Sequence, residues 1–208
     1  MHILIIYTGE FQTKKAPIGG IFQLNQAKLL NSNGYKVGIL NPCVISPRHF
    51  LNKYEKGKSF FYKEKIPIFK FYKKNLMPRK FKMFNQSLKK KYEKISLDLF
   101  QLYIEKNGMP DLCHVFDVRF GLVVGSILKK KYKIPFIFTE YCVETANNTF
   151  PVDKKYKKID IIPQLKKANV IALPSKKFSI IFKKYFNIKK KINFLPPVLP
   201  PDLFKIKK

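Results

Sequence analysis

Acidic side chains are scarce in this 208-residue chain. Thirteen Asp and Glu residues stand against forty-two Lys and Arg, which gives a formal net charge of +29 at pH 7. Such a balance favours an anionic partner: nucleic acid, an acidic membrane face or a phosphorylated substrate. A compositional origin is the alternative, because Lys, Phe, Ile and Asn are all abundant, as in proteins from AT-rich genomes. No recognised RNA- or DNA-binding motif accompanies the charge, so nucleic acid is the less favoured partner.

Cysteines and long apolar runs are also few. Cys43, Cys113 and Cys142 are widely spaced and form no Cys-x-x-Cys pair, which argues against a disulfide framework or a zinc site and favours a reducing compartment. No apolar run reaches the roughly 20 residues of a membrane span. The N-terminus lacks the basic start and the small-residue cleavage site of a signal peptide. We therefore expect a cytoplasmic protein that acts in solution or at the inner face of the cytoplasmic membrane.

Apolar strands and amphipathic helices alternate along most of the chain. A helical pattern begins at Ile21 and is closed by Asn33-Gly34, and another covers residues 176–186, where Ser175 is the predicted N-cap. The other predicted helices cover residues 81–106, 118–132 and 160–168. In the helix 118–132, the small residues Gly121, Gly125 and Ser126 are expected to press on the sheet. The predicted strands cover residues 2–7, 36–40, 112–116, 135–139, 170–173 and 192–195, and Asn41-Pro42 is expected to close the second of them. About six strands that alternate with helices predict an α/β fold with a doubly wound, mostly parallel, Rossmann-like sheet.

Residues 53–106 depart from this alternation, because lysines and aromatic residues interleave there before the long helix. Residues 60–62 and 68–72 have the composition of short strands. We expect this insertion to carry a membrane-facing surface, since basic groups attract an anionic leaflet and aromatic residues enter the interface. A solvated helix face is the alternative. The residues predicted to form this surface are Lys73, Lys74, Arg79, Lys80, Phe81, Lys82 and Phe84.

In an open α/β sheet, ligands bind beyond the carboxyl ends of the strands. The candidates after successive strands are Gly9, Glu10, Gly19 and Gly20, then Asp117 and Arg119, then Glu140, Tyr141 and Glu144, and finally Ser175. The Gly19-Gly20 pair either lets the backbone approach a phosphate or forms a tight turn. Glu140 is a candidate base or sugar-hydroxyl ligand, with a structural hydrogen bond as the alternative.

The remaining candidates have stronger structural alternatives. Asp117 can cap the next helix and pair with Arg119, Glu144 is expected to be solvated, and His114 lies within an apolar strand and is expected in the core. The glycine spacing matches neither a dinucleotide fingerprint nor a P-loop. No metal-ligand pair and no Ser/His/Asp order is present. The sequence therefore predicts no metal and no cofactor.

Five segments, taken in order, resemble motifs of the family-4 glycosyltransferases of GT-B type. They are the opening residues 1–6 with the later Gly19-Gly20, Pro-Asp-Leu-Cys-His-Val-Phe-Asp at 110–117, Ile-Pro-Phe-Ile-Phe-Thr-Glu-Tyr at 134–141, Ala-Asn-Val-Ile-Ala-Leu-Pro-Ser at 168–175, and residues 192–204. The sequence departs from the family at Phe116 and Tyr141, where histidines are expected, and at Pro197 and Leu199 or Pro200, which replace Asn and Asp.

The resemblance implies metal-independent transfer of a sugar from a nucleotide-sugar to a glycan or lipid-linked acceptor. It implies that Glu140 and Tyr141 lie near the reacting sugar, and that Gly19, Gly20, Asp117, Arg119 and Ser175 bind substrate or donor phosphate. Residues 1–200 would be the family's N-terminal domain and 201–208 the start of a linker, with the C-terminal donor domain absent. We then expect this chain alone to be inactive and to need a separately encoded domain. A non-catalytic remnant, or a basic domain that binds a membrane or nucleic acid, is the alternative.

Overall fold

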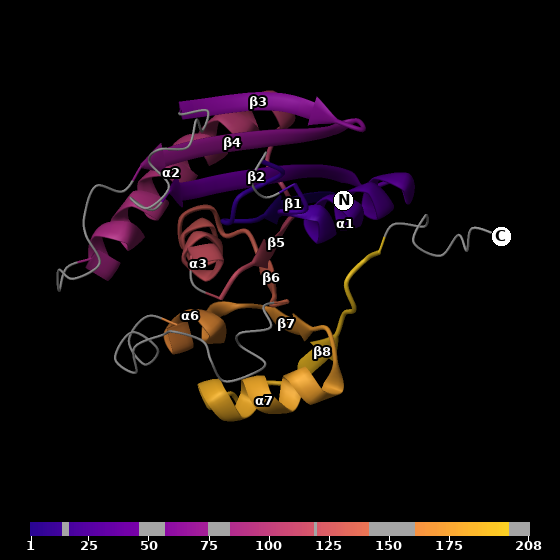
Figure 1. The fold of residues 1–208 in the computed structure, drawn as a ribbon, viewed down its shortest axis with the longest axis vertical. Coiled ribbons are helices and arrows are strands. Elements are labelled where there is room, and N and C mark those ends of the chain that lie inside the picture. Colours follow the sequence, from indigo (N-terminus) through magenta and orange to yellow (C-terminus); the bar gives the residue numbers. More distant parts are fainter. Residues whose placement is uncertain (14–16, 46–56, 75–83, 119, 142–160, 200–208) are drawn as a thin grey trace.

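A computed structural model describes residues 1–13, 17–45, 57–74, 84–118, 120–141 and 161–199 (Figure 1). Its centre is an eight-stranded sheet in the order β3-β4-β2-β1-β5-β6-β7-β8. Every neighbouring pair is parallel except β3 and β4. The predicted α/β, doubly wound, mostly parallel sheet is therefore confirmed. The strands are β1 (His2–Ile6), β2 (Lys36–Ile45), β3 (Gly57–Lys63), β4 (Ile66–Lys74), β5 (Leu112–Phe116), β6 (Phe136–Thr139), β7 (Val170–Leu173) and β8 (Ile192–Phe194).

The helices divide unequally between the two faces of the sheet. One apolar cluster joins Leu4 and Ile6 of β1 to helices α2, α3, α6 and α7, whereas a second joins Ile5 to Leu24 and Ala27 of α1. Alternate residues of a strand point to opposite faces, so α1 covers one face and the other four helices cover the opposite one. The helices are α1 (Ile21–Ser32), α2 (Phe84–Asn107), α3 (Phe120–Tyr132), α6 (Ile162–Lys167) and α7 (Lys176–Phe186).

Strand β2 is longer than its sequence indicates. The pair Asn41-Pro42 was expected to end the strand, yet β2 continues to Ile45. Strand β1 pairs with β2 only as far as Leu40, whereas β4 pairs with β2 from Ile39 to Ile45. Pro42 therefore lies where β2 has one strand neighbour, and a missing N–H is tolerated at such an edge position. The expectation of a turn at Pro42 was wrong because that neighbour was not apparent in the sequence.

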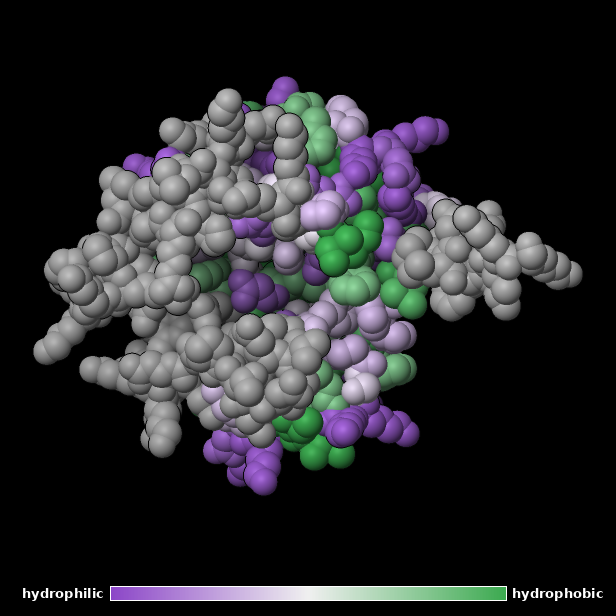
Figure 2. All heavy atoms as spheres, in the orientation of Figure 1, coloured by the Kyte–Doolittle hydropathy of each residue, from purple (hydrophilic) through white to green (hydrophobic). Residues whose placement is uncertain are grey.

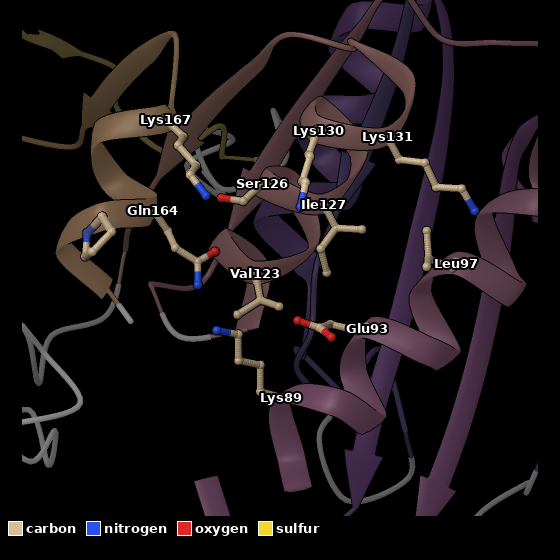
Figure 3. A pocket seen from close by; sticks show the side chains of 11 residues that line it. Lys89, Glu93, Leu97, Val123, Ser126, Ile127, Lys130, Lys131, Gln164 and Lys167 are labelled. Carbon is tan, nitrogen blue, oxygen red and sulfur yellow. The ribbon is translucent and has the colours of Figure 1, made fainter. Parts of the chain in front are cut away.

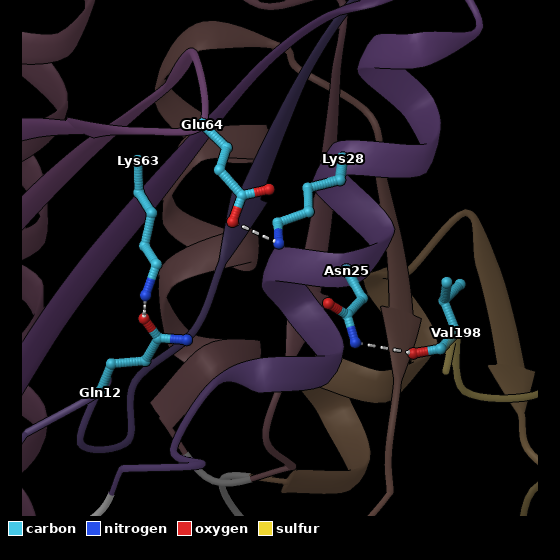
Figure 4. A network of polar contacts seen from close by, with 6 residues as sticks. All are labelled: Gln12, Asn25, Lys28, Lys63, Glu64 and Val198. Atoms are coloured by element: carbon cyan, nitrogen blue, oxygen red, sulfur yellow. Dashed lines mark hydrogen bonds and ion pairs between the residues drawn. The ribbon is translucent and has the colours of Figure 1, made fainter. Parts of the chain in front are cut away.

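The lysine- and aromatic-rich region forms a hairpin followed by the expected long helix. Its two strand-like segments are β3 and β4, joined by the two-residue turn Glu64-Lys65, since Lys63 pairs with Ile66. Both turn residues have positive φ, 49° and 67°, as a type I′ turn requires. An ion pair of 2.6 Å between Lys28 of α1 and Glu64 holds the turn against the helix (Figure 4).

Two glycines let α3 lie directly on the sheet. A Cβ at Gly121 would stand 1.8 Å from the Phe116 carbonyl oxygen, and one at Gly125 would stand 2.9 Å from Val115 Cγ2. The sequence predicted this close approach for Gly121, Gly125 and Ser126. Ser126 instead lines a groove among the helices, because it lies about 100° further round α3. Helix α3 begins at Phe120 rather than at Val118.

Most apolar side chains are buried, but some large ones are exposed. Figure 2 shows green residues near α7 among purple ones, and Ile180 of α7 is 69% exposed. Cys43 and Cys113 are buried free thiols, and burial raises the pKa of the Cys43 thiol to about 12. Both act as small core residues, whereas Cys142 lies outside the described residues. No helix in the described ranges is long and apolar enough to cross a membrane.

Candidate functional site

The chain reverses its direction across the sheet between β1 and β5. From β1 it proceeds through β2 to β4 on one side, and then returns to β5 and continues to β8 on the other. The carboxyl ends of β1 and β5 therefore form the switch point, where open α/β sheets bind ligands. Thr8, just after β1, donates a hydrogen bond from Oγ1 to Asp117 Oδ2, just after β5. This contact lies at the centre of the candidate site.

The segment between β1 and α1 is held from several directions. Asn41 Nδ2 of β2 donates to the carbonyl oxygens of Tyr7 and Gly9 at 2.7 and 2.9 Å. Phe11 N donates to Tyr72 Oη of β4 at 2.8 Å, and Lys63 of β3 donates to the Gln12 amide oxygen (Figure 4). These contacts from three strands hold residues 7–12 in place, which lowers the cost of ordering them when a ligand binds.

Gly20 begins α1 in a conformation that suits glycine. Its φ is 72°, and a Cβ there would lie 2.4 Å from Cδ2 of Phe11. Gly19 contributes its carbonyl oxygen to Gln12 N at 2.9 Å. Burial raises the pKa of Tyr7 to about 12, helped by the nearby Asp117 charge and opposed by a hydrogen bond from the Gly20 backbone. The glycine pair thus serves a tight turn, and its role toward phosphate stays a prediction.

Glu140 joins β6 to the β5 side of the site. The residue is 4% exposed, and Oε2 accepts a hydrogen bond of 2.8 Å from Val118 N, at the approach to α3. The structural hydrogen bond expected from the sequence as an alternative for Glu140 is therefore present. Glu140 therefore ties the end of β6 to the residue that follows Asp117.

Tyr141 lies beside Glu140 and is half-buried. Its ring packs against Phe22 of α1 and Phe116 of β5, at centroid distances of 5.8 and 5.6 Å. Burial raises the pKa of the phenol to about 12, so Tyr141 carries its proton at neutral pH. It can donate a hydrogen bond but cannot act as a base there.

His114 is a core residue, as the sequence indicated. Nδ1 accepts a hydrogen bond of 3.1 Å from the Gln26 amide of α1, and Nε2 lies 2.8 Å from Thr139 Oγ1 of β6. Burial lowers the pKa of His114 to about 3, so the ring is neutral near pH 7. It connects α1, β5 and β6 beneath the site.

The other predicted residues are spread more widely. Ser175 caps α7, since Oγ accepts from Phe178 N at 3.0 Å. Arg119 and Glu144 lie outside the described residues, as do Arg79, Lys80, Phe81, Lys82 and the side chain of Phe84. Lys73 and Lys74 end β4, so the membrane-facing surface stays a prediction. Within the described ranges, no cluster of three or more His, Cys, Asp or Glu residues is placed to hold a metal ion.

Four contributors were missed in the sequence. Thr8 directly follows the predicted strand 2–7, just as Glu140 follows the predicted strand 135–139, so the signal for Thr8 was present. Tyr7 falls inside that predicted strand, whereas β1 ends at Ile6. The sequence predicts a turn at Asn41, because only the β2–β4 pairing places this residue inside a strand. Tyr92 of α2 also reaches this region, where Val44 N donates to its hydroxyl at 3.1 Å and the hydroxyl lies 3.4 Å from the Thr8 carbonyl oxygen.

Solved structures share this fold over nearly all of the chain. An E. coli trehalose-6-phosphate structure with UDP-2-fluoro glucose bound has a TM-score of 0.56 and 11% identity, over 98% of this chain and 50% of that one. The S. aureus MnaA structure with UDP has a TM-score of 0.52 and 13% identity, over 99% and 48%. UGT89C1 from Arabidopsis thaliana with UDP has a TM-score of 0.51 and 12% identity, over 96% and 53%.

At sequence identities of 11–13%, these structures show that the chain has a similar fold and show nothing further. The chain spans about half the length of the structures that it matches. No family model and no curated protein matches the sequence.

Proposed function

We propose that this chain is one half of a GT-B glycosyltransferase, which transfers a sugar from a nucleotide-sugar to a glycan or lipid-linked acceptor. The supporting observation is the shared fold, which extends over 96–99% of this chain and about half of each of three structures bound to UDP or a UDP-sugar. The ordered motifs of the sequence resemble family-4 glycosyltransferases and support the same proposal independently. Fold alone does not decide function, so the proposal also depends on the site.

The switch-point site offers suitable chemistry for a sugar. Asp117 and Glu140 are hydrogen-bond acceptors for hydroxyl groups, and Tyr141 is a neutral donor beside them. Asp117 has φ of 79°, a conformation that costs a non-glycine residue free energy and is common at functional sites. In this proposal these groups orient the acceptor, and fixed backbone dipoles stabilise the leaving diphosphate.

The proposal includes a second domain. Transfer by a GT-B enzyme takes place between two domains, and positioning of the reacting groups supplies roughly 7–11 kcal/mol of barrier reduction. Residues 1–208 would supply only one of the two walls and therefore only part of that positioning. We therefore propose that turnover requires a second domain that carries the family's Glu-x7-Glu motif.

A sugar-transfer assay tests both parts of the proposal. The purified chain, with UDP-glucose or UDP-N-acetylglucosamine and a panel of acceptors, should release no UDP above the background rate. Addition of the partner domain should restore release. In that mixture, Asp117→Asn should lower kcat/KM at least about ten-fold, as expected when a hydrogen bond to a charged group worth 1.5–3 kcal/mol is lost. Glu105→Gln, at an exposed position of α2, is the matched control and should leave the rate unchanged.

Two results would contradict the proposal in different ways. Robust turnover by the chain alone would disprove the half-enzyme part and leave sugar transfer standing. No turnover with any partner, combined with no binding of nucleotide-sugar or acceptor, would disprove sugar transfer. The alternative of a non-catalytic binding domain, which the net charge of +29 favours, would then explain the protein better.

A further inference from the structure

A groove of about 630 Å³ lies between α2, α3 and α6 (Figure 3). Each helix contributes both polar and apolar side chains to its walls. These helices cover the face of the sheet opposite to α1, and the groove residues do not include any of the switch-point site. The lining residues used below are Lys89, Glu93, Leu97, Val123, Ser126, Lys130, Lys131 and Lys167.

Positive charge converges on this groove. Lys89, Lys130, Lys131 and Lys167 line it, against the single carboxylate of Glu93. Figure 3 shows these side chains, drawn from three different helices, around one space. Like charges held close together destabilise a fold unless an anion compensates them. The arrangement therefore favours a negatively charged occupant.

The neighbouring Lys129 differs from the groove lysines Lys130 and Lys167 in its hydrogen bonds. Lys129 Nζ donates to the Lys167 carbonyl oxygen at 2.7 Å and to Asn169 Oδ1 at 3.0 Å, so its charge stabilises the end of α6. Among the residues that the structure describes, Lys130 Nζ and Lys167 Nζ have no such contact. Their ammonium groups keep all three donors for a ligand.

The floor of the groove is mixed in character. Val123 is 1% exposed and Ser126 6%, and Ser126 Oγ has no hydrogen-bond partner in the described structure. A buried hydroxyl without a partner costs free energy. A ligand oxygen that reaches the floor would satisfy this hydroxyl, while an apolar part of the ligand would contact Val123 and Leu97.

We propose that this groove binds the phosphate group of a small ligand that has a partly apolar body. Phosphate suits the groove because lysine binds it as a point charge and its oxygens accept from several donors at once. The site does not depend on the proposed sugar transfer, since it uses other residues on the opposite face of the sheet. Its failure and that of the proposed function are therefore distinguishable.

Calorimetric titration at fixed ionic strength tests the proposal with two probes. Inorganic pyrophosphate represents free phosphate, and dihexanoyl phosphatidic acid below its micelle concentration represents a lipid headgroup. The double variant Lys130→Gln/Lys167→Gln should raise the Kd of the bound probe at least ten-fold. The control Lys176→Gln/Lys177→Gln removes the same charge from the exposed start of α7 and should change the Kd less than two-fold.

A variant that binds more tightly is also informative, because a misfolded variant would bind more weakly. Glu93→Gln removes the only carboxylate of the groove lining and should lower the Kd three-fold or more. Binding of either probe with this pattern supports the proposal, and the probe that binds identifies the source of the phosphate. Equal weakening by the two double variants would show a general charge effect and overturn it. No measurable binding of either probe to the unaltered chain would overturn it as well.

Discussion

Burial determines the charge state of His114. The ring is enclosed by α1, β5 and β6, with Gln26 and Thr139 as its hydrogen-bond partners, and its pKa is lowered to about 3. An unfolded chain would protonate the same side chain near its ordinary pKa of about 6.5. A proton that binds only to the unfolded state lowers the stability of the folded one. Burial of the neutral His114 ring therefore lowers the stability of the fold in acid.

We predict that acid weakens the fold through His114. Between pH 7 and pH 5 the unfolded state takes up a proton at this residue and the folded state does not, so the free energy of unfolding falls by about 2 kcal/mol. Urea denaturation at the two pH values measures the difference. His114→Gln, although less stable at pH 7, should lose about 2 kcal/mol less over the same interval.

His2 serves as the internal comparison for this experiment. Burial also lowers its pKa, so it contributes to the acid sensitivity of both proteins and cancels in their difference. An identical pH dependence for the unaltered chain and His114→Gln would contradict the assignment of the effect to His114.

At the residue scale, the sequence identified about half of the site. Asp117 and Glu140 follow buried strands, and the structure brings both to the switch-point region. Asn41 was missed because its role depends on strand pairing, which is a property of distant segments. Ser175 and Gly20 were selected for phosphate, while local geometry, a helix cap and a tight turn, already accounts for them.

At the scale of elements, the β3–β4 hairpin combines a favourable pairing with an unfavourable turn. Glu64 and Lys65 both have positive φ, which is costly for residues with a side chain. Phe60 of β3 packs against Phe69 of β4 at a centroid distance of 4.6 Å. The strand contacts therefore stabilise a turn that these two residues would not choose by themselves.

We predict that Lys65→Gly stabilises the protein. Glycine adopts the left-handed conformation without strain, and the gain exceeds its extra entropy cost in the unfolded chain. The expected increase is about 0.5–1 kcal/mol in the free energy of unfolding. Chemical denaturation measures it.

The control for the turn variant lies in the adjacent strand. Lys58→Gly changes the same residue type at an exposed position of β3, where glycine has no conformational advantage. It should lower the free energy of unfolding by roughly 0.5–1 kcal/mol. Destabilisation by both substitutions would show that the turn at Lys65 is not strained.

The elements were largely predictable where their pattern is local. The predicted strands at 112–116 and 170–173 match β5 and β7, and α7 with its Ser175 cap matches residue for residue. The extension of β2 past Pro42 and the full length of β3 could not be predicted, because each depends on β4 as a partner. Apolar periodicity indicates which face of a strand is buried. The length of a strand also depends on how far the adjacent strand extends, and the local sequence does not show this.

At the scale of the whole molecule, charge repulsion is the dominant electrostatic feature. The net charge is +29, and the lysines of α2, α3, α6 and α7 lie on one side of the sheet. Compact folding brings these charges closer together than they are in the unfolded chain. Salt screens repulsion between exposed charges over distances longer than about 10 Å at 0.1 M.

We predict that the melting temperature rises with salt. Between 20 and 300 mM NaCl the Tm should increase by roughly 2–4 °C, which corresponds to about 1 kcal/mol for a domain of this size. Differential scanning fluorimetry or calorimetry at pH 7 measures it. KCl should give the same rise, because screening depends on ionic strength and not on the ion. An unchanged or lower Tm in both salts would be inconsistent with net repulsion.

The strand order also has a consequence for how the protein is made. From β1 outward on one side, β5, β6, β7 and β8 lie in the order in which the ribosome delivers them. Each new strand can therefore pair with the strand made just before it, which lies at the edge of the sheet. No strand has to be inserted between two strands that are already paired. The exception is the first of these additions, since β1 must wait about a hundred residues for β5. Until then, the edge of β1 that later pairs with β5 stays open to wrong partners.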